Sequence, residues 1–243
     1  MQLPSFIRDP AVAVIGEKCY GSLIEDLNLG DVDCIKYSMS KAIGIAMILG
    51  GSIVKIPQIL TIVRNQSAEG LSLVSYVLET LSYSITTSYN LRQHNPFSTF
   101  GEIMLILIQN VIITMLIFYF SGKQGMMAVS LVGVATVLYC LNNSAIVPPV
   151  LMNSLFAATI PLNMASKVPQ IYTNFKNKST GQLSTFACVN YFAGSLARVF
   201  TTMAELDDPI MLFGGLLATT LNAVLLLQVI IYWGAKGTKT KKE

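Results

Sequence analysis

Two lysines, Lys55 and Lys167, lie inside long apolar stretches of the sequence, where charged residues are rare. A charge at membrane depth usually faces the interior of a helix bundle or a water-filled cavity. An ammonium group binds phosphate well, so each lysine is a candidate contact for a phosphorylated ligand. Both also lie near the end of their stretch, from where a lysine can extend to the membrane surface, and that structural interpretation stays open.

Two further charged positions suggest ion pairs. Glu79 lies at a depth similar to that of Lys55 on the next apolar stretch, so the two can meet. Arg198 and Glu102 both lie a turn or two from the opposite face of the membrane. Because buried charges need partners, a purely structural ion pair is the alternative explanation for each of these two positions. Glu79 nevertheless stays a candidate for ligand binding, and Arg198, if it has no such partner, is a candidate contact for an anionic ligand.

Amide side chains occupy the middle of two other apolar stretches, at Gln109, Asn110 and Asn222. An asparagine between membrane helices commonly forms an interhelical hydrogen bond worth about 1 kcal/mol. The same amide can donate to and accept from a polar ligand. We therefore treat all three as candidate ligand-binding residues, with a purely structural role as the open alternative.

The sequence contains no recognisable catalytic set. It has no nucleophile elbow, no glycine-rich phosphate loop and no cysteine–histidine spacing typical of a metal site, and His94 is its one histidine. We expect no catalytic residues, no metal and no cofactor, and therefore a protein that is not an enzyme. We also expect no nucleic acid partner.

An internal repeat places these residues in register. The segment KIPQILTIVRNQSAEGLS, residues 55–72, aligns without a gap to KVPQIYTNFKNKSTGQLS, residues 167–184, with nine identities in eighteen positions. Each copy contains Pro-Gln, at Pro57–Gln58 and Pro169–Gln170. A proline breaks or kinks a helix, and the neighbouring glutamine can satisfy the freed backbone groups. The break serves either as a hinge or as a static kink.

The elements that must position these residues are membrane-spanning helices. Hydrophobic residues make up 53% of the 243-residue chain and charged residues only 12%, which is unlike a soluble domain. Stretches of about 20 apolar residues are long enough to cross a bilayer, and they must be helical there. We expect seven such helices, at residues 37–60, 71–92, 97–120, 125–142, 147–175, 183–204 and 209–233.

The repeat organises these seven helices as 3+1+3, an all-α membrane fold. Three spans per copy and one linking helix give the copies the same orientation, so the repeat is parallel. The expected parts are an N-terminal segment, a first repeat, a linker helix, a second repeat and a basic tail, at residues 1–36, 37–120, 121–146, 147–233 and 234–243.

Charge outside the helices predicts which side faces the cytosol. Seven crossings place eight Lys and Arg residues on one side of the membrane and four on the other. The positive-inside rule then makes the C-terminus cytosolic and the N-terminus lumenal or extracellular. In the tail, Lys239 and Lys241 resemble the cytosolic dilysine signal that retrieves proteins to the endoplasmic reticulum. In the N-terminal segment, Cys19 and Cys34 either form a disulfide or remain free thiols.

The duplicated Pro-Gln motif within a 3+1+3 arrangement resembles the PQ-loop superfamily, which includes SWEET sugar transporters, lysosomal cystine exporters and KDEL receptors. The segments SAEGLS, TGQLS and GSLARVFT, residues 194–201, resemble more narrowly the branch that acts in the use of dolichol-phosphate mannose. This narrower resemblance covers residues 36–233.

The resemblance implies a protein of the endoplasmic-reticulum membrane that makes dolichol-phosphate mannose and dolichol-phosphate glucose usable as lumenal donors. The implied partners are membrane lipid, these lipid-linked monosaccharides and glycosyltransferases of that membrane. In the sugar-transporting relatives an asparagine on each of the third and seventh helices lines the substrate pocket, and Asn110 and Asn222 match those positions. Transport of a small solute such as a sugar or an amino acid is therefore the alternative.

Overall fold

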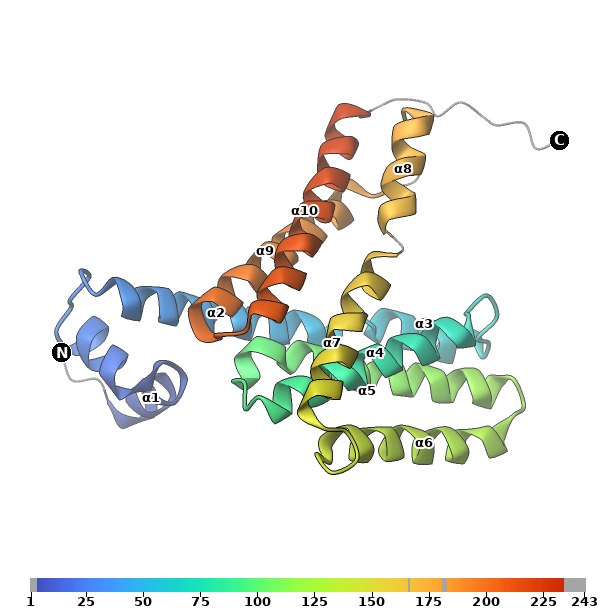
Figure 1. Ribbon diagram of the computed structural model, residues 1–243, viewed down its shortest axis with the longest axis horizontal. Helices are drawn as coiled ribbons and strands as arrows, with labels where there is room; N and C mark the ends of the chain where they lie inside the picture. The colour runs from blue at the N-terminus through green and yellow to red at the C-terminus, as the bar shows by residue number, and fades with distance from the viewer. Residues whose placement is uncertain (1–3, 166, 181–182, 234–243) are drawn as a thin grey trace. The chain divides into compact units, whose positions relative to one another are not determined.

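The structure is a computed structural model, and it describes residues 4–165, 167–180 and 183–233. Within these ranges all regular structure is helical (Figure 1), which confirms the expected all-α class. Four of the described helical segments are long and apolar enough to cross a membrane: Val32–Asn65, Phe97–Phe120, Gln124–Asn142 and Pro209–Ile231. The seven crossings and their 3+1+3 arrangement stay a prediction.

The described part of the N-terminal segment is largely helical. Helix α1 spans Ser5–Tyr20, and a single π-helical turn, η1, follows at Gly21–Glu25. Cys19 and Cys34 form a disulfide that ties the end of α1 to the first turn of the next helix. Asp31 begins that helix by accepting a hydrogen bond from the backbone N–H of Cys34. This bond, together with one from the Ser22 hydroxyl, lowers the pKa of the Asp31 carboxyl.

The chain divides into two compact units, Met1–Thr159 and Ile160–Glu243. Besides α1 and η1, the first unit contains five further helices and the start of α7: α2 Val32–Ile53, α3 Ile56–Asn65, α4 Leu73–Arg92, α5 Phe97–Phe120 and α6 Gln124–Asn142. Helix α5 packs against α2, α3, α4 and α6. Glycine allows the close approach of α2, because a Cβ at Gly44 or Gly51 would collide with Ser98 or Glu102 of α5.

The second unit repeats this packing. It contains the end of α7 Pro149–Met164, followed by α8 Lys167–Asn177, α9 Thr185–Glu205 and α10 Pro209–Ile231. Helix α10 contacts both α8 and α9, as α5 contacts α3 and α4 (Figure 1). Glycine again permits close packing, since a Cβ at Gly215 would lie 3.1 Å from Val199 of α9. Each unit thus places the third helix of its repeat beside the first and the second.

Both long spans that contain the repeat motif are interrupted, as the prolines predict. The predicted helix 37–60 is split between α2 and α3, and the predicted helix 147–175 is split between α7 and α8. Pro57 is the second residue of α3, and Pro169 is the third residue of α8. In a first turn the missing proline N–H loses no intrahelical hydrogen bond, so the new helix can begin there. The breaks are confirmed, and their use as hinges stays a prediction.

Candidate functional site

Lys55 lies at the first helix break, where it is the N-cap of α3. Its ammonium Nζ lies 2.6 Å from Oε2 of Glu79 on α4 and donates a second hydrogen bond to Oδ1 of Asn110 on α5. The Lys55 side chain is 17% exposed and that of Glu79 is 45% exposed. The predicted ion pair is therefore confirmed, and it joins the three helices of the first repeat.

Asn110 is fully buried and uses both ends of its amide. Its Oδ1 accepts from Lys55, while its Nδ2 donates to the backbone oxygen of Tyr76 at 3.1 Å and to Oγ1 of Thr80 at 3.2 Å. Both acceptors belong to α4. Inside a membrane polar groups must be satisfied within the protein, and this geometry does so for the Asn110 amide.

The second repeat builds the same network. Lys167, at the start of α8, donates from Nζ to Oδ1 of Asn222 on α10 at 2.6 Å. Asn222 in turn donates from Nδ2 to the backbone oxygen of Tyr191 and to Oγ of Ser195, each at 3.0 Å, on α9. The two lysines and the two asparagines each lie 112 residues apart. The predicted candidates are thus brought together as two lysine–asparagine networks, one in each unit.

Gln109 has a role that the sequence did not indicate. Its Nε2 donates to the backbone oxygen of Gly51 at 2.7 Å, and its Oε1 accepts from the backbone N–H of Lys55 at 2.9 Å. In an unbroken helix these two backbone groups would bond to each other, because they are four residues apart. The Gln109 amide therefore replaces the hydrogen bond that the break removes. The sequence predicted that Gln58 satisfies these backbone groups, and at the first break Gln109 of α5 does so instead.

Arg198 and Glu102 belong to different units, so a pair between them stays a prediction. Glu102 is buried on α5, and Arg198 lies on α9. Lys239 and Lys241 lie outside the described residues. Among the residues that the structure describes, no group of three or more His, Cys, Asp or Glu side chains is placed to hold a metal ion.

Two polar features were missed by sequence reasoning. Lys41 is buried on α2, donates to Oγ of Ser98 at 2.8 Å, and lies 5.0 Å from the centre of the Tyr37 ring. In the second unit, the buried Asn174 donates to Gln228 at 3.1 Å, and Gln228 donates to the backbone of α8. For Gln228 the available signal was a polar residue inside the apolar run VLLLQVII, residues 224–231, whereas Lys41 and Asn174 have polar neighbours in the sequence.

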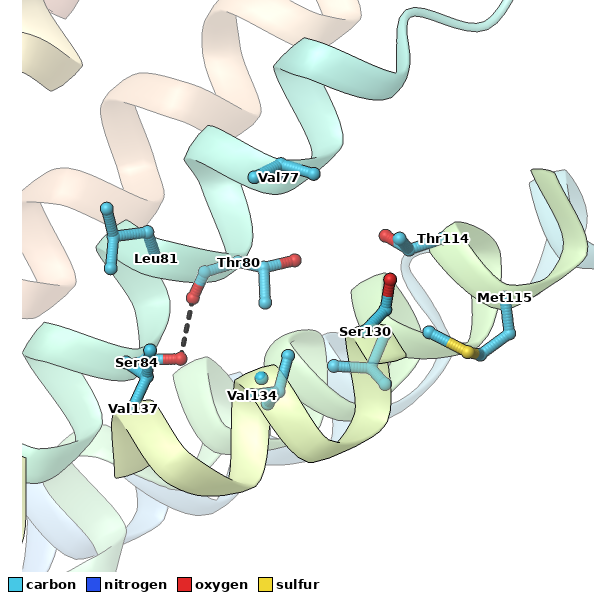
Figure 2. Close-up of a pocket in the computed structure, with 11 residues that line it drawn as sticks. Val77, Thr80, Leu81, Ser84, Thr114, Met115, Ser130, Val134 and Val137 are labelled. Carbon is cyan, nitrogen blue, oxygen red and sulfur yellow. Dashed lines mark hydrogen bonds between the residues drawn. The ribbon is translucent and has the colours of Figure 1, made fainter. Parts of the chain in front are cut away.

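An apolar pocket of about 260 Å³ lies between α4, α5 and α6 in the first unit (Figure 2). Its wall is mainly aliphatic, and hydroxyl groups of Thr80, Ser84, Thr114 and Ser130 interrupt it. Thr80 also accepts the hydrogen bond from Asn110, so the pocket adjoins the first lysine–asparagine network. A cavity of this character suits a hydrocarbon chain better than a sugar.

Comparison with known proteins agrees with the duplicated geometry. The family profile described as "PQ loop repeat" matches residues 39–99 and 151–211, which together make up about half of the chain and are offset by the same 112 residues as the two networks. The human protein "Solute carrier family 66 member 3" is 26% identical over 180 residues, covering 73% of this chain and 86% of that protein. No solved structure matches the chain significantly. The chain is therefore a multi-pass membrane protein that belongs to the PQ-loop repeat family.

Proposed function

We propose that this protein acts in the endoplasmic-reticulum membrane and makes dolichol-phosphate mannose and dolichol-phosphate glucose usable as sugar donors on the lumenal side. It does so by binding, presenting or flipping the lipid-linked sugar. The observation that carries the proposal is the duplicated network in which an ammonium and an amide meet inside a helix bundle, at Lys55–Asn110 and Lys167–Asn222. Such a pair offers a cation for a phosphate and hydrogen-bonding groups for a sugar.

Two further observations support this ligand class. The apolar pocket between α4, α5 and α6 provides a surface for part of an isoprenoid chain. The segments that include SAEGLS and GSLARVFT resemble the mannose-P-dolichol utilisation defect 1 proteins, which act on this donor pathway. The expected partners are membrane lipid, the dolichol-phosphate-linked monosaccharides and glycosyltransferases of the same membrane. A nucleic acid partner, a cofactor and catalysis by this chain are not part of the proposal.

The proposed topology is seven crossings in a 3+1+3 arrangement, with the N-terminus lumenal and the C-terminus cytosolic. The Cys19–Cys34 disulfide supports it, because disulfides persist in the oxidising lumen and are rare in the cytosol. The basic tail supports it as well, since positive charge favours the cytosolic side.

The test is the analysis of lipid-linked oligosaccharides in cells that lack the protein. We expect dolichol-phosphate mannose to be synthesised but poorly used, so that truncated, under-mannosylated oligosaccharides accumulate. Re-expression of the wild-type chain should restore the full-length species. Full-length oligosaccharides in the null cells would refute the proposal.

Transport of a small solute is the second candidate. It is favoured by the similarity to a protein named as a solute carrier and by the buried Asn110 and Asn222 on equivalent helices. Purified protein in sealed vesicles should then accumulate a labelled sugar or amino acid against an empty-vesicle control. Uptake in vesicles combined with normal oligosaccharides in null cells would select this alternative.

A further inference from the structure

The two lysine–asparagine networks differ in their acidic residue. Tyr76 and Thr80 of α4 hold Asn110 in the same way that Tyr191 and Ser195 of α9 hold Asn222. These contacts align α4 with α9 at an offset of 115 residues, because Tyr191 lies three residues further from the N-cap Ser184 of α9 than Tyr76 lies from the N-cap Ser72 of α4. At that offset the residue equivalent to Glu79 is Gly194. The second repeat therefore keeps the lysine and the asparagine and lacks the carboxylate.

No other acid of the second unit takes the place of Glu79. In the described part of this unit the acids are Glu205, Asp207 and Asp208, which lie where α9 ends and α10 begins. Asn222 lies fourteen residues beyond Asp208, which corresponds to about 20 Å along a helix axis. Within the described residues of the unit, the Lys167 ammonium thus has Asn222 as its hydrogen-bond acceptor and no carboxylate at ion-pair distance.

The space for an anion is present at this position. A Cβ built on Gly194 meets no atom within 4 Å, and the residue is exposed on α9. In the first repeat the Glu79 carboxylate lies beside Lys55 and Asn110. A group lying against Gly194 would have the same position beside Lys167 and Asn222. In the first repeat the protein supplies the anion from its own sequence, and in the second repeat the position is open.

We propose that the second repeat is the anion-binding half of the protein, and that Lys167 binds the phosphate of a lipid-linked ligand over Gly194. The inference deepens the proposed function and rests on it for the identity of the ligand. One ammonium beside a neutral amide matches the single negative charge of a phosphodiester.

The decisive variant is Gly194→Glu, which would supply the missing carboxylate from the protein. Gly194→Gln is its matched control, because it has nearly the same size and no charge. Both replace a glycine inside a helix with a better helix former at a position that has room for a side chain, so both should fold. Lys167→Met removes the cation itself, and thermal unfolding of each purified variant verifies that it is folded.

Binding is measured on the purified full-length protein in lipid nanodiscs. The probes are citronellyl phosphate mannose, which carries a phosphodiester, an uncharged citronellyl mannoside and inorganic phosphate. We expect the phosphodiester to bind the wild type and the Gly194→Gln variant, and to bind the Gly194→Glu and Lys167→Met variants at least about tenfold more weakly. The uncharged mannoside should bind all four proteins equally and weakly.

Equal affinity of the phosphodiester for the Gly194→Glu and Gly194→Gln variants would overturn the inference, as would undiminished affinity for Lys167→Met. Binding of inorganic phosphate as tight as that of the phosphodiester would keep the anion site and exclude the lipid-linked source. The proposed function fails separately. If null cells assemble normal oligosaccharides while the binding pattern holds, the anion site is supported and the proposed function is refuted. If null cells accumulate truncated oligosaccharides while Gly194→Glu binds the phosphodiester as well as the wild type, the proposed function is supported and the anion site is refuted.

Discussion

Glu79 neutralises a charge that the fold holds at membrane depth. Its carboxylate and the Asn110 amide together receive the Lys55 ammonium, so the cation has both a counter-ion and a hydrogen-bond acceptor. Aromatic rings of Tyr76 and Tyr83 lie 5.0 and 5.9 Å from the same nitrogen. Removal of one partner would leave the ammonium without a counter-charge, which costs more than the loss of the whole pair.

We predict that Glu79→Gln lowers the stability of the purified protein. The cost should stay below the roughly 3–5 kcal/mol seen for fully buried pairs, because the Glu79 side chain is nearly half exposed. Adding Lys55→Met to Glu79→Gln should recover part of the loss, since no unpaired charge then remains. Thermal unfolding in detergent measures both effects, with Glu69→Gln in the exposed α3–α4 loop as the control. A double variant less stable than Glu79→Gln would contradict this account.

The sequence predicted some of these side-chain contacts and missed others. The Lys55–Glu79 pair followed from equal depth on neighbouring antiparallel helices, and the Asn110–Asn222 correspondence followed from the repeat. The contact between Asn174 and Gln228 could not be predicted in this way. It depends on which faces of α8 and α10 meet, and the equivalent position of the first repeat is Ile62, within an apolar cluster.

At the scale of the helix, the broken first span is held by the Gln109 amide of α5 as well as by proline. Pro57 removes the N–H that would bond to the carbonyl of Ile53, and Gln109 bridges Gly51 and Lys55. At the equivalent position the second repeat has Leu221. The prolines were readable from the sequence alone, whereas the side chain that stabilises the break lies on a different helix.

We predict that Gln109→Leu destabilises the protein, because it leaves the Lys55 N–H and the Gly51 carbonyl without partners at about 1–3 kcal/mol each. Pro57→Ala alone should change stability by less than about 1 kcal/mol, since Pro57 lies in the first turn of α3. The double variant should be more stable than the sum of the two effects, because α2 and α3 can then join through a Lys55–Gly51 hydrogen bond. If the change in unfolding free energy of the double variant equals the sum of the two single changes, this coupling is contradicted.

The same variants test whether the breaks are hinges. We expect the Pro57→Ala, Gln109→Leu double variant, and Pro169→Ala alone, to reduce rescue of lumenal mannosylation in null cells while protein levels hold. If function requires the two halves of a broken helix to move against each other, joining them into one continuous helix should reduce that function. Full rescue by both variants would leave the prolines as fixed architectural elements.

At the scale of the whole molecule, we predict that the C-terminal tail determines in which membrane of the cell the protein is retained. Lys239 and Lys241 fall outside the described residues, so this prediction rests on their spacing from the C-terminus. Replacing both with Ser should let the protein leave the endoplasmic reticulum, as shown by fractionation and by acquired resistance of a reporter glycan to endoglycosidase H. Replacement of Lys123, at the α5–α6 junction, with Ser is the control that removes a charge outside the tail. Unchanged residence of the tail variant would assign these lysines to topology alone.

The Cys19–Cys34 disulfide tests the proposed topology of the entire chain. Seven crossings place the two termini on opposite sides, so a lumenal N-terminus requires a cytosolic tail. Cys140 and Cys188 are the free cysteines in the described residues, and the sequence has four cysteines in all. A maleimide-polyethylene glycol reagent should therefore modify two cysteines in the denatured, unreduced protein and four after reduction.

The Cys19→Ser variant sharpens this test, because it should leave Cys34 free and raise the unreduced count by one. It should also cost roughly 3 kcal/mol of stability, since the bond closes a loop between residues 15 apart. Four reactive cysteines in the unreduced wild type would place the N-terminal segment in a reducing compartment. With seven crossings, that result would put the lysine-rich tail in the lumen, where no cytosolic retrieval receptor could reach it. The positive-inside assignment and the retrieval prediction would then both be wrong.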